Sequence, residues 1–308
     1  MGRPLRYLPP DCPLVEVTCR TVQGRLLLRP SHQLNAVVLG LLARAARLFE
    51  MQVCVFVFLS NHYHLLLRPS SARQLSYFMG YFNGNLAKEA GRLHRWREKF
   101  WGRRYRDIPV SFEPEAQIDR LRYLLEQGCK ENLVARPQDW PGASSVAALR
   151  TGEPIAGIWQ DRTEEYRARR RGEVVSSDDF ASEETLELSP LPCWEDVDGQ
   201  EIRRQVEKML EQIIRVTAQR HRSRRTRPLG RRRILRQRSY AWPRRVRRTP
   251  APRFHAASFE IRKMLEAMYW AFLDLRAEAL EALRAGRFPV RFPAHGIPPP
   301  LAPALGAA

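Results

Sequence analysis

The stretch MQVCVFVFLSNHYHLLLRP, residues 51–69, decides the fold that we expect for this chain. It is rich in β-branched and aromatic residues, a composition typical of buried strands. The polar pair Ser60-Asn61 interrupts the apolar run, so we predict two strands that meet at this point. His62 and His64 then lie at the start of the second strand.

Helix and strand patterns flank these two strands. Before them, residues 14–28 alternate apolar and polar positions in places, and residues 32–50 repeat apolar residues at helical spacing. After them, we expect helices over 72–95 and 114–130 and a further strand over 101–112. The order strand, helix, strand, strand, helix, strand, helix predicts an α+β sandwich in which helices cover one sheet.

Composition changes along the 308 residues predict four parts. Residues 1–150 carry the pattern of the sandwich. Residues 151–200 are partly acidic and contain Pro and Ser, so we expect a linker there. Residues 201–285 are expected to form a mostly helical, basic extension, and the Pro-rich residues 286–308 to be disordered.

Positive charge is the strongest compositional signal, because 52 Lys and Arg against 33 Asp and Glu leave a net charge of +19. Fifteen arginines and no Asp or Glu lie between Arg215 and Arg248. Clustered cations release counterions from phosphates, so nucleic acid is the first partner to consider. Acidic membranes are the second candidate, and a basic surface without a partner is the third.

The cysteines and the apolar segments indicate a cytoplasmic protein with no membrane partner. The five cysteines are odd in number and scattered, which argues against a disulfide framework. The N-terminal residues lack the apolar stretch of a signal peptide. Charged residues and histidines interrupt the apolar part before any run of about 18 residues that could span a membrane.

His62 and His64 are candidate metal ligands. Side chains two positions apart on a strand point to the same face, so both imidazoles can reach one cation. Imidazole suits Mn²⁺ and related ions, and Mg²⁺ is tolerated when an oxygen ligand and a phosphate complete the shell. The alternative is two ordinary histidines satisfied by hydrogen bonds. The surrounding buried strand favours the metal, because two buried polar rings need compensation.

Tyr123 is the candidate nucleophile. It lies in the predicted helix IDRLRYLLEQ, where Gln127 is four positions further on and therefore on the same helix face. An oxygen of Gln127, or less readily of Glu126, could join the histidines on a cation. A phenol with a pKa near 10 needs such a cation to activate its target. The alternative is a tyrosine that only packs in an amphipathic helix.

Three stretches together resemble the REP-associated tyrosine transposase branch of the single-tyrosine HUH (IS200-like) transposases. They are FVFLSNHYHLLLRP (56–69), FWGRRYRDI (100–108) and RYLLEQGCKENLVARPQDWPGASS (122–145), within a resemblance over roughly residues 12–150. The resemblance implies a ferredoxin-like sandwich with an antiparallel sheet. Where this family branch usually has Asn-Pro after its tyrosine, this chain has Gln127-Gly128.

The resemblance also implies a chemistry. His62, His64 and Gln127 would hold a divalent metal ion, Mg²⁺ or Mn²⁺, and Tyr123 would attack single-stranded or hairpin DNA. A 5′-phosphotyrosine intermediate would form, and a second strand end would reverse the attack. No nucleotide cofactor is needed, and the chain has no GxxxxGK[ST] motif. The alternatives are a catalytically inactive protein that binds structured nucleic acid, and a nuclease that uses the metal alone.

Two groups of arginines are candidate DNA contacts. The first flanks Trp101 and Tyr105, and such interleaving of cations and aromatics suits phosphates and stacked bases. The second belongs to the arginine-rich segment, which also contains Tyr240 and Trp242 as possible stacking residues. A solvated strand edge and a nonspecific DNA- or RNA-binding tail are the rival interpretations. The candidate contacts are Arg103, Arg104, Arg106, Arg224, Arg225, Arg231, Arg232 and Arg233.

Overall fold

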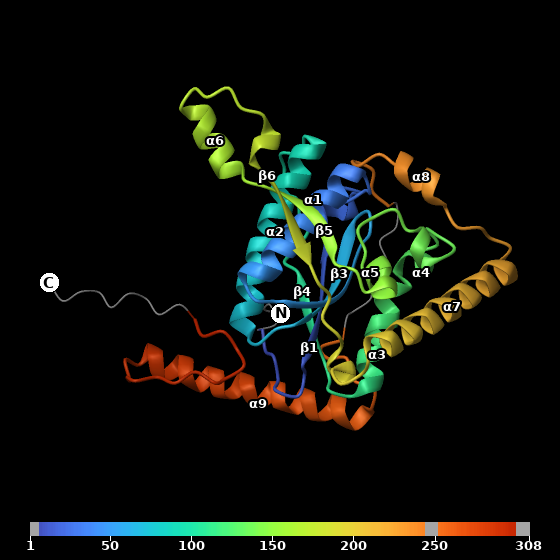
Figure 1. Ribbon diagram of the computed structural model, residues 1–308. Coiled ribbons are helices and arrows are strands. Elements are labelled where there is room, and N and C mark those ends of the chain that lie inside the picture. Colours follow the sequence, from blue (N-terminus) through green and yellow to red (C-terminus); the bar gives the residue numbers. More distant parts are fainter. Residues whose placement is uncertain (1–5, 244–251, 300–308) are drawn as a thin grey trace.

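A computed structural model describes residues 6–243 and 252–299 of the chain (Figure 1). Its centre is a four-stranded antiparallel sheet with the strand order β2-β3-β1-β4. With α1 after β1 and α2 after β3, the chain order is βαββαβ, which is the ferredoxin-like arrangement. The expected α+β sandwich is confirmed. Its elements are β1 (Leu14–Arg20), α1 (His32–Leu48), β2 (Gln52–Phe58), β3 (His62–Arg68), α2 (Ala72–His94) and β4 (Arg106–Val110).

Strand β3 lies inside the sheet, and both of its faces are covered. Tyr63, Leu65 and Leu67 belong to the core under α1 and α2, whereas Leu66 belongs to the core on the opposite face. Because side chains alternate along a strand, His62 and His64 point to the same side as Leu66. The continuous apolar run of this segment follows from burial on both faces.

Helices α1 and α2 cover one face of the sheet (Figure 1). Ser31 caps α1 by accepting a hydrogen bond from the backbone N–H of Leu34, and Ser71 caps α2 in the same way from Gln74. The buried side of α1 carries apolar residues at helical spacing. These two helices therefore begin and pack as the sequence pattern predicts.

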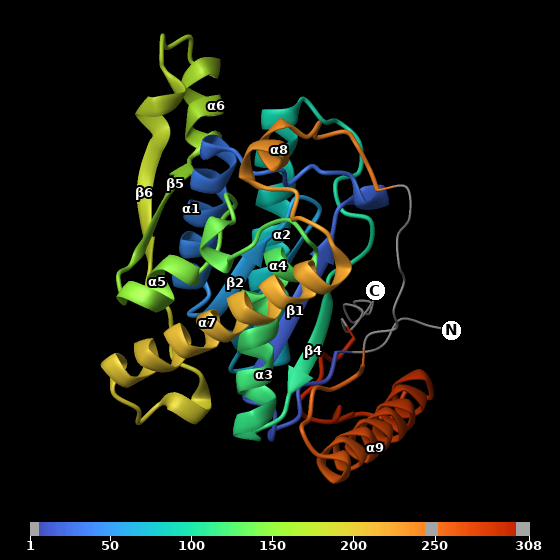
Figure 2. The ribbon, with the colours of Figure 1, turned by 90° about the vertical axis from the view of Figure 1, so that its right-hand side faces the viewer.

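The opposite face of the sheet packs against α3 (Pro114–Leu125) and α7 (Gly199–Arg224) (Figure 2). Pro114 lies in the first turn of α3, where its missing N–H removes no helical hydrogen bond. The helix expected over 114–130 is divided at Glu126, and α4 (Gln127–Lys130) follows it. The short helix α5 (Val146–Thr151) lies against α7.

The linker prediction for residues 151–200 is wrong over much of this range. Strands β5 (Ile155–Gln160) and β6 (Ala181–Leu186) form a two-stranded sheet that packs on α1. Glu184 forms ion pairs of 2.7 Å with Arg44 and Arg47 of α1. The acidic residue is thus a counter-ion for a helix. Between the strands lies α6 (Arg162–Arg170). The 3-10 turns within the described ranges are η1 (Val22–Gly24), η2 (Pro137–Asp139), η3 (Ser177–Phe180) and η4 (Pro192–Trp194).

The C-terminal extension is mostly helical, as expected, and consists of α7, α8 (Arg231–Arg236) and α9 (Phe259–Arg284) within the described residues. It shares the core of the sandwich, because Val206 and Leu210 of α7 are buried together with residues of α3. Farther along, α9 packs on the N-terminal segment, where the rings of Tyr7 and Phe272 stack with centroids 4.6 Å apart.

The Pro-rich tail was expected to be disordered over residues 286–308. The structure places its first part, in which the carbonyl of His295 accepts a hydrogen bond of 2.9 Å from the backbone N–H of Leu8. Residues 300–308 lie outside the described residues. Across 6–243 and 252–299, every helix is too short or too polar to cross a membrane.

Candidate active site

The candidate site lies at the start of β3, on the face of the sheet that α3 covers. His62 pairs with Arg20 of β1, and His64 pairs with Thr18. Both imidazoles are buried, and their ring centroids lie 5.2 Å apart. The strand therefore presents both rings to one small volume.

Each imidazole uses its Nδ1 atom for a hydrogen bond. His64 Nδ1 donates to Glu16 Oε1 at 2.9 Å, and His62 Nδ1 donates to Asn61 Oδ1 at 2.6 Å. The orientation of the Asn61 amide follows from its Nδ2, which donates to the carbonyl of Gly24 at 3.1 Å. Because both acceptors are oxygens, Nδ1 is the nitrogen that carries the proton in the neutral form of each ring, and Nε2 is then the nitrogen with the free lone pair.

This arrangement fits a bound metal ion. Metal-ligating histidines almost always donate their second N–H to a carboxylate or carbonyl oxygen, which orients the ring and raises its basicity. The Nε2 atom of each imidazole is the one that would bind the ion, because Nδ1 is used for the orienting hydrogen bond. Burial, next repulsion from His64 when that ring is protonated, and then the charge of Arg20 lower the pKa of His62 well below its usual value. His62 is therefore neutral and able to act as a ligand at neutral pH.

Glu16 is a buried carboxylate that holds the site together. Its Oε2 atom lies 2.9 Å from His255 Nε2 and 3.6 Å from Arg120 Nη1. Burial tends to raise the pKa of Glu16, but hydrogen bonding to His255 and His64 outweighs it, so the pKa falls below its usual range. Glu16 stays ionised and is a poor proton acceptor, so its role is to orient His64.

Tyr123 of α3 lies against this pair. Its ring centroid is 5.6 Å from that of His64, and the two planes are nearly perpendicular at 80°. Two cations approach the same ring, with Arg120 Cζ at 4.7 Å and Lys130 Nζ at 4.1 Å from the centroid. Burial and then the charge of Glu16 raise the pKa of Tyr123, whereas Gln127 and Arg120 act in the opposite direction. The phenol is therefore protonated at neutral pH.

Gln127 completes the set of expected ligands. Its side chain is buried, and its Nε2 donates to the backbone carbonyl of Tyr123 at 3.0 Å. The amide oxygen is then the atom left for a cation. Among residues 6–243 and 252–299, no three His, Cys, Asp or Glu side chains converge as metal ligands. A metal shell here would consist of two imidazoles, one amide oxygen, and oxygens from water or a phosphate.

The first group of candidate arginines lies near the site. Thr18 pairs with His64 on one side and with Arg106 of β4 on the other, so all three side chains share one face of the sheet. Arg103 and Arg104 precede β4 and are exposed, as is Arg106. An anion bound at the histidines would thus have the exposed Arg106 on the same face of the sheet, two strands away.

The second group lies at the end of α7 and on α8. Its five members, like the first three, have exposed side chains. The backbone N–H groups of Leu229 and Gly230 donate to the carbonyls of Asn132 and Leu133, directly after α4. This places α8 beside the helix that carries Gln127. The members are Arg224, Arg225, Arg231, Arg232 and Arg233.

Four residues of the site are not among the sequence predictions: Glu16, Arg20, Arg120 and His255. The sequence could have indicated Glu16, because it is a carboxylate among the mostly apolar residues of the strand LVEVTCR and needs a partner once it is buried. Arg120 precedes Tyr123 by three positions and so shares its helix face. His255 has no such signal, since it reaches Glu16 only through a bridge between the C-terminal segment and Val110.

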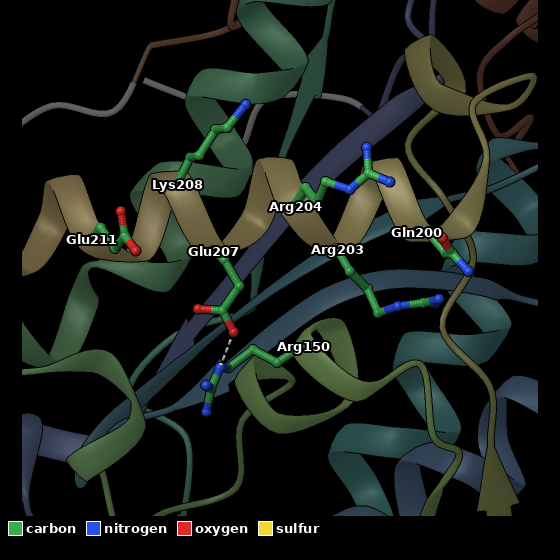
Figure 3. A pocket seen from close by; sticks show the side chains of 7 residues that line it. All are labelled: Arg150, Gln200, Arg203, Arg204, Glu207, Lys208 and Glu211. Carbon is green, nitrogen blue, oxygen red and sulfur yellow. Dashed lines mark hydrogen bonds and ion pairs between the residues drawn. The ribbon is translucent and has the colours of Figure 1, made fainter.

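A separate shallow concavity lies between α5 and α7 (Figure 3). Arg150 and Glu207 form an ion pair of 2.5 Å across it. None of the candidate catalytic or metal-binding residues lines this concavity. Its lining consists of Arg150, Gln200, Arg203, Arg204, Glu207, Lys208 and Glu211.

No protein-family model and no curated protein matches the chain. Two solved structures are similar to part of it. A REP-associated tyrosine transposase bound to a REP hairpin has 16% identity and a TM-score of 0.41, over 48% of this chain and 85% of that one. A candidate transposase of Deinococcus radiodurans R1 has 16% identity and a TM-score of 0.25, over 39% and 93%.

Proposed function

We propose that this protein is a metal-dependent DNA strand transferase that cleaves and rejoins single-stranded or hairpin DNA through Tyr123. One observation carries the proposal. Each imidazole uses Nδ1 for a hydrogen bond and so leaves Nε2 for a ligand, and the ring centroid of Tyr123 lies 5.6 Å from that of His64. A nucleophile beside a paired-imidazole site suits transfer of a phosphate ester.

His62, His64 and Gln127 would hold the metal ion, Mg²⁺ or Mn²⁺. When bound, such an ion withdraws charge from a phosphate and so makes its phosphorus easier to attack. Glu16 and Asn61 fix the orientation of the two rings through their Nδ1 atoms. The ligands are thereby oriented before any substrate arrives, which reduces the reorganisation that binding requires.

In the cleavage step, the Tyr123 oxygen forms a bond to phosphorus as the bond from phosphorus to the 3′ oxygen breaks. The phenol loses its proton, and the departing 3′ oxygen gains one. The product is a 5′-phosphotyrosine and a free 3′-hydroxyl. A second 3′-hydroxyl then reverses the step, so the number of phosphodiester bonds is conserved and no nucleotide is consumed.

Arg120 has two roles in this mechanism. Its charge lowers the pKa of Tyr123 and thus opposes the effect of Glu16. It also lies 3.6 Å from Glu16 and 4.7 Å from the tyrosine ring, so it balances the carboxylate that would otherwise repel a phosphate. The exposed side chains of Arg103, Arg104 and Arg106 would hold the neighbouring phosphates of the strand.

Covalent capture tests the proposal. The full chain is incubated with Mn²⁺ or Mg²⁺ and a labelled DNA hairpin that carries a single-stranded extension, and then denatured. We expect a labelled protein adduct that disappears on Tyr123→Phe and on addition of a chelator. Tyr77→Phe is the matched control, because Tyr77 is exposed on α2, the helix that covers the other face of the sheet.

The other outcomes distinguish the rival functions. Binding without an adduct in the wild-type protein would favour a catalytically inactive protein that binds structured nucleic acid. Cleavage that survives Tyr123→Phe would favour hydrolysis by a metal-bound nuclease. An adduct that Tyr77→Phe removes as completely as Tyr123→Phe would contradict the assignment of the nucleophile.

A further inference from the structure

Four side chains from three distant parts of the chain form a stack on the surface beside the candidate site. The Arg25 guanidinium lies over two indoles, with its Cζ 4.4 Å from the ring centroid of Trp242 and 5.3 Å from that of Trp96. The ring of Tyr240 is tilted by 32° against Trp96, at a centroid distance of 5.7 Å. We call these four residues the aromatic ladder.

Hydrogen bonds to backbone carbonyls hold the ladder in place. Leu26 N–H donates to the carbonyl of Ala241 at 2.9 Å, and Arg25 Nη1 donates to the carbonyl of Tyr240 at 2.7 Å. The hydroxyl of Tyr240 donates to the carbonyl of His94. Residues 240–242 are thus fixed to the sandwich, and the stacking surface is formed without a ligand.

The aromatic rings of the ladder are more exposed than rings that served only to attach residues 240–242 to the sandwich would be. Trp242 keeps 57% of its surface exposed and Tyr240 keeps 46%. A tryptophan that served only to attach this segment would gain most by burying its indole, since apolar contact stabilises in proportion to the area removed from water. Large exposed aromatic faces next to arginines are the surface on which unpaired bases stack.

The ladder adjoins the histidine pair through a short series of contacts. A Cβ atom placed on Gly24 would lie 3.5 Å from ring carbons of Pro243 and 3.7 Å from Asn61 Nδ2. Asn61 in turn accepts the hydrogen bond of His62. Pro243 directly follows Trp242, so the exposed indole lies only a few side chains from the candidate metal ligands.

We propose that the aromatic ladder binds an unpaired DNA base that flanks the phosphate held at His62 and His64, with the base stacked on Trp242. The location relative to the phosphate rests on the proposed function, whereas the stacking itself does not. Exposed arginines of α8 and the following turn, Arg236 and Arg238 among them, supply cations for the adjoining backbone. The C-terminal extension would therefore contribute a base-binding site to the sandwich.

Equilibrium binding without metal tests the ladder. Fluorescence anisotropy at fixed salt, with a chelator present so that no cleavage occurs, compares a hairpin carrying a single-stranded extension with the same hairpin lacking it. We expect Trp242→Ala to weaken binding of the extended hairpin by about fivefold or more and to leave the blunt hairpin within about twofold. Trp242→Phe should retain most of the affinity, because a stacking face remains.

Trp270→Ala is the matched control, because Trp270 is 56% exposed but lies on α9, away from α8 (Figure 1). An abasic nucleotide scanned through the extension should weaken wild-type binding at one or two positions. At those positions it should have little further effect in Trp242→Ala, since both changes remove the same contact.

Three results would overturn the proposal: equal weakening of both DNAs by Trp242→Ala, an abasic effect that persists unchanged in that variant, or equal weakening by Trp270→Ala. The first would indicate that Trp242 only maintains the structure. The binding test needs neither metal nor Tyr123. Extension-dependent binding in this test, together with no adduct in the covalent capture assay that contains metal, would therefore refute the strand transferase and leave the ladder intact.

Discussion

Glu16 determines the geometry of the candidate site more than any other single residue. It accepts a hydrogen bond from His64 and lies within 4 Å of His255 and Arg120, so four chain segments meet at one carboxylate. Removing one member of such a buried charged group leaves the others without compensation. The carboxylate is needed as an acceptor for His64, and its charge is needed to balance its neighbours.

Glu16→Gln is expected to weaken Mn²⁺ binding by about 10- to 100-fold, the usual effect of losing a partner that orients a metal ligand. Calorimetric titration of the full chain measures the affinity. Glu115→Gln is the control, because Glu115 is exposed in the first turn of α3. Equal affinities in wild type and Glu16→Gln would show that this carboxylate does not orient a ligand.

His62 makes stability depend on pH in a defined direction. Its pKa is lowered well below the usual value by burial, whereas in the unfolded chain it titrates near 6.5. Below that pH the unfolded state binds more protons than the folded state, so stability decreases as pH falls. We expect a loss of at most about 1.4 kcal/mol per pH unit from this group.

Urea unfolding at pH values from 7.5 to 5.5 measures how stability depends on pH. This window lies above the range in which ordinary carboxylates titrate. His62→Gln should lose less stability over this range than the wild-type protein. His32→Gln serves as the control, since His32 is exposed at the start of α1. If the wild-type protein and His62→Gln show the same slope, burial of the neutral imidazole is not the cause.

Among the elements, the two-stranded β5–β6 sheet and α1 approach each other unusually closely. A Cβ atom on Gly157 would lie 2.1 Å from the backbone nitrogen of Gly40, and one on Gly40 would lie 2.2 Å from the carbonyl carbon of Ile158. Two facing glycines therefore allow backbone to pack on backbone. The ion pairs of Glu184 with Arg44 and Arg47 lie at the same contact.

Gly157→Ala is expected to destabilise the fold by about 1–3 kcal/mol, because the obstructing atoms belong to the backbone and cannot move aside easily. Gly80→Ala is the opposite control. Gly80 is exposed within α2, and a Cβ atom there would meet nothing within 4 Å. The Gly80→Ala substitution should therefore stabilise the folded protein by about 0.5–1 kcal/mol. Chemical denaturation gives both values, and no loss in Gly157→Ala would refute the close contact.

At the scale of the whole molecule, the C-terminal extension is part of the sandwich. α7 buries Val206, Leu210 and Ile213 in the core that also contains Leu121 of α3. Residues 252–258 continue this connection, because His255 forms a bridge with Val110 and reaches Glu16. The expected division into a sandwich and a separate extension therefore does not describe how the core is built.

Truncation after residue 198 should expose the apolar face of α3 and yield an aggregating or unfolded chain. The full chain should unfold in one transition, with tryptophan fluorescence and far-ultraviolet circular dichroism changing together. A fragment of residues 1–198 that folds with the melting temperature of the full chain would contradict the shared core.

Local periodicity was sufficient to predict the sheet and the relative placement of the candidate site residues. Alternation along β3 places His62 and His64 on one face, and helical spacing places Gln127 one turn after Tyr123. These relations need only the chain within a few residues. The order of the elements was likewise sufficient for the α+β arrangement.

The residues that join the candidate site from distant parts of the chain became evident from the folded structure alone. Glu16 and His255 are far apart in sequence, and their contact depends on the sheet register and on the segment beside β4. The acidic residues of 151–200 are ambiguous in sequence for a related reason. A carboxylate such as Glu184 can be solvated or can form an ion pair with a helix, and the composition is the same in both cases. Periodicity is a local property, whereas pairing of charges and stacking of rings depend on which surfaces the folded chain brings together.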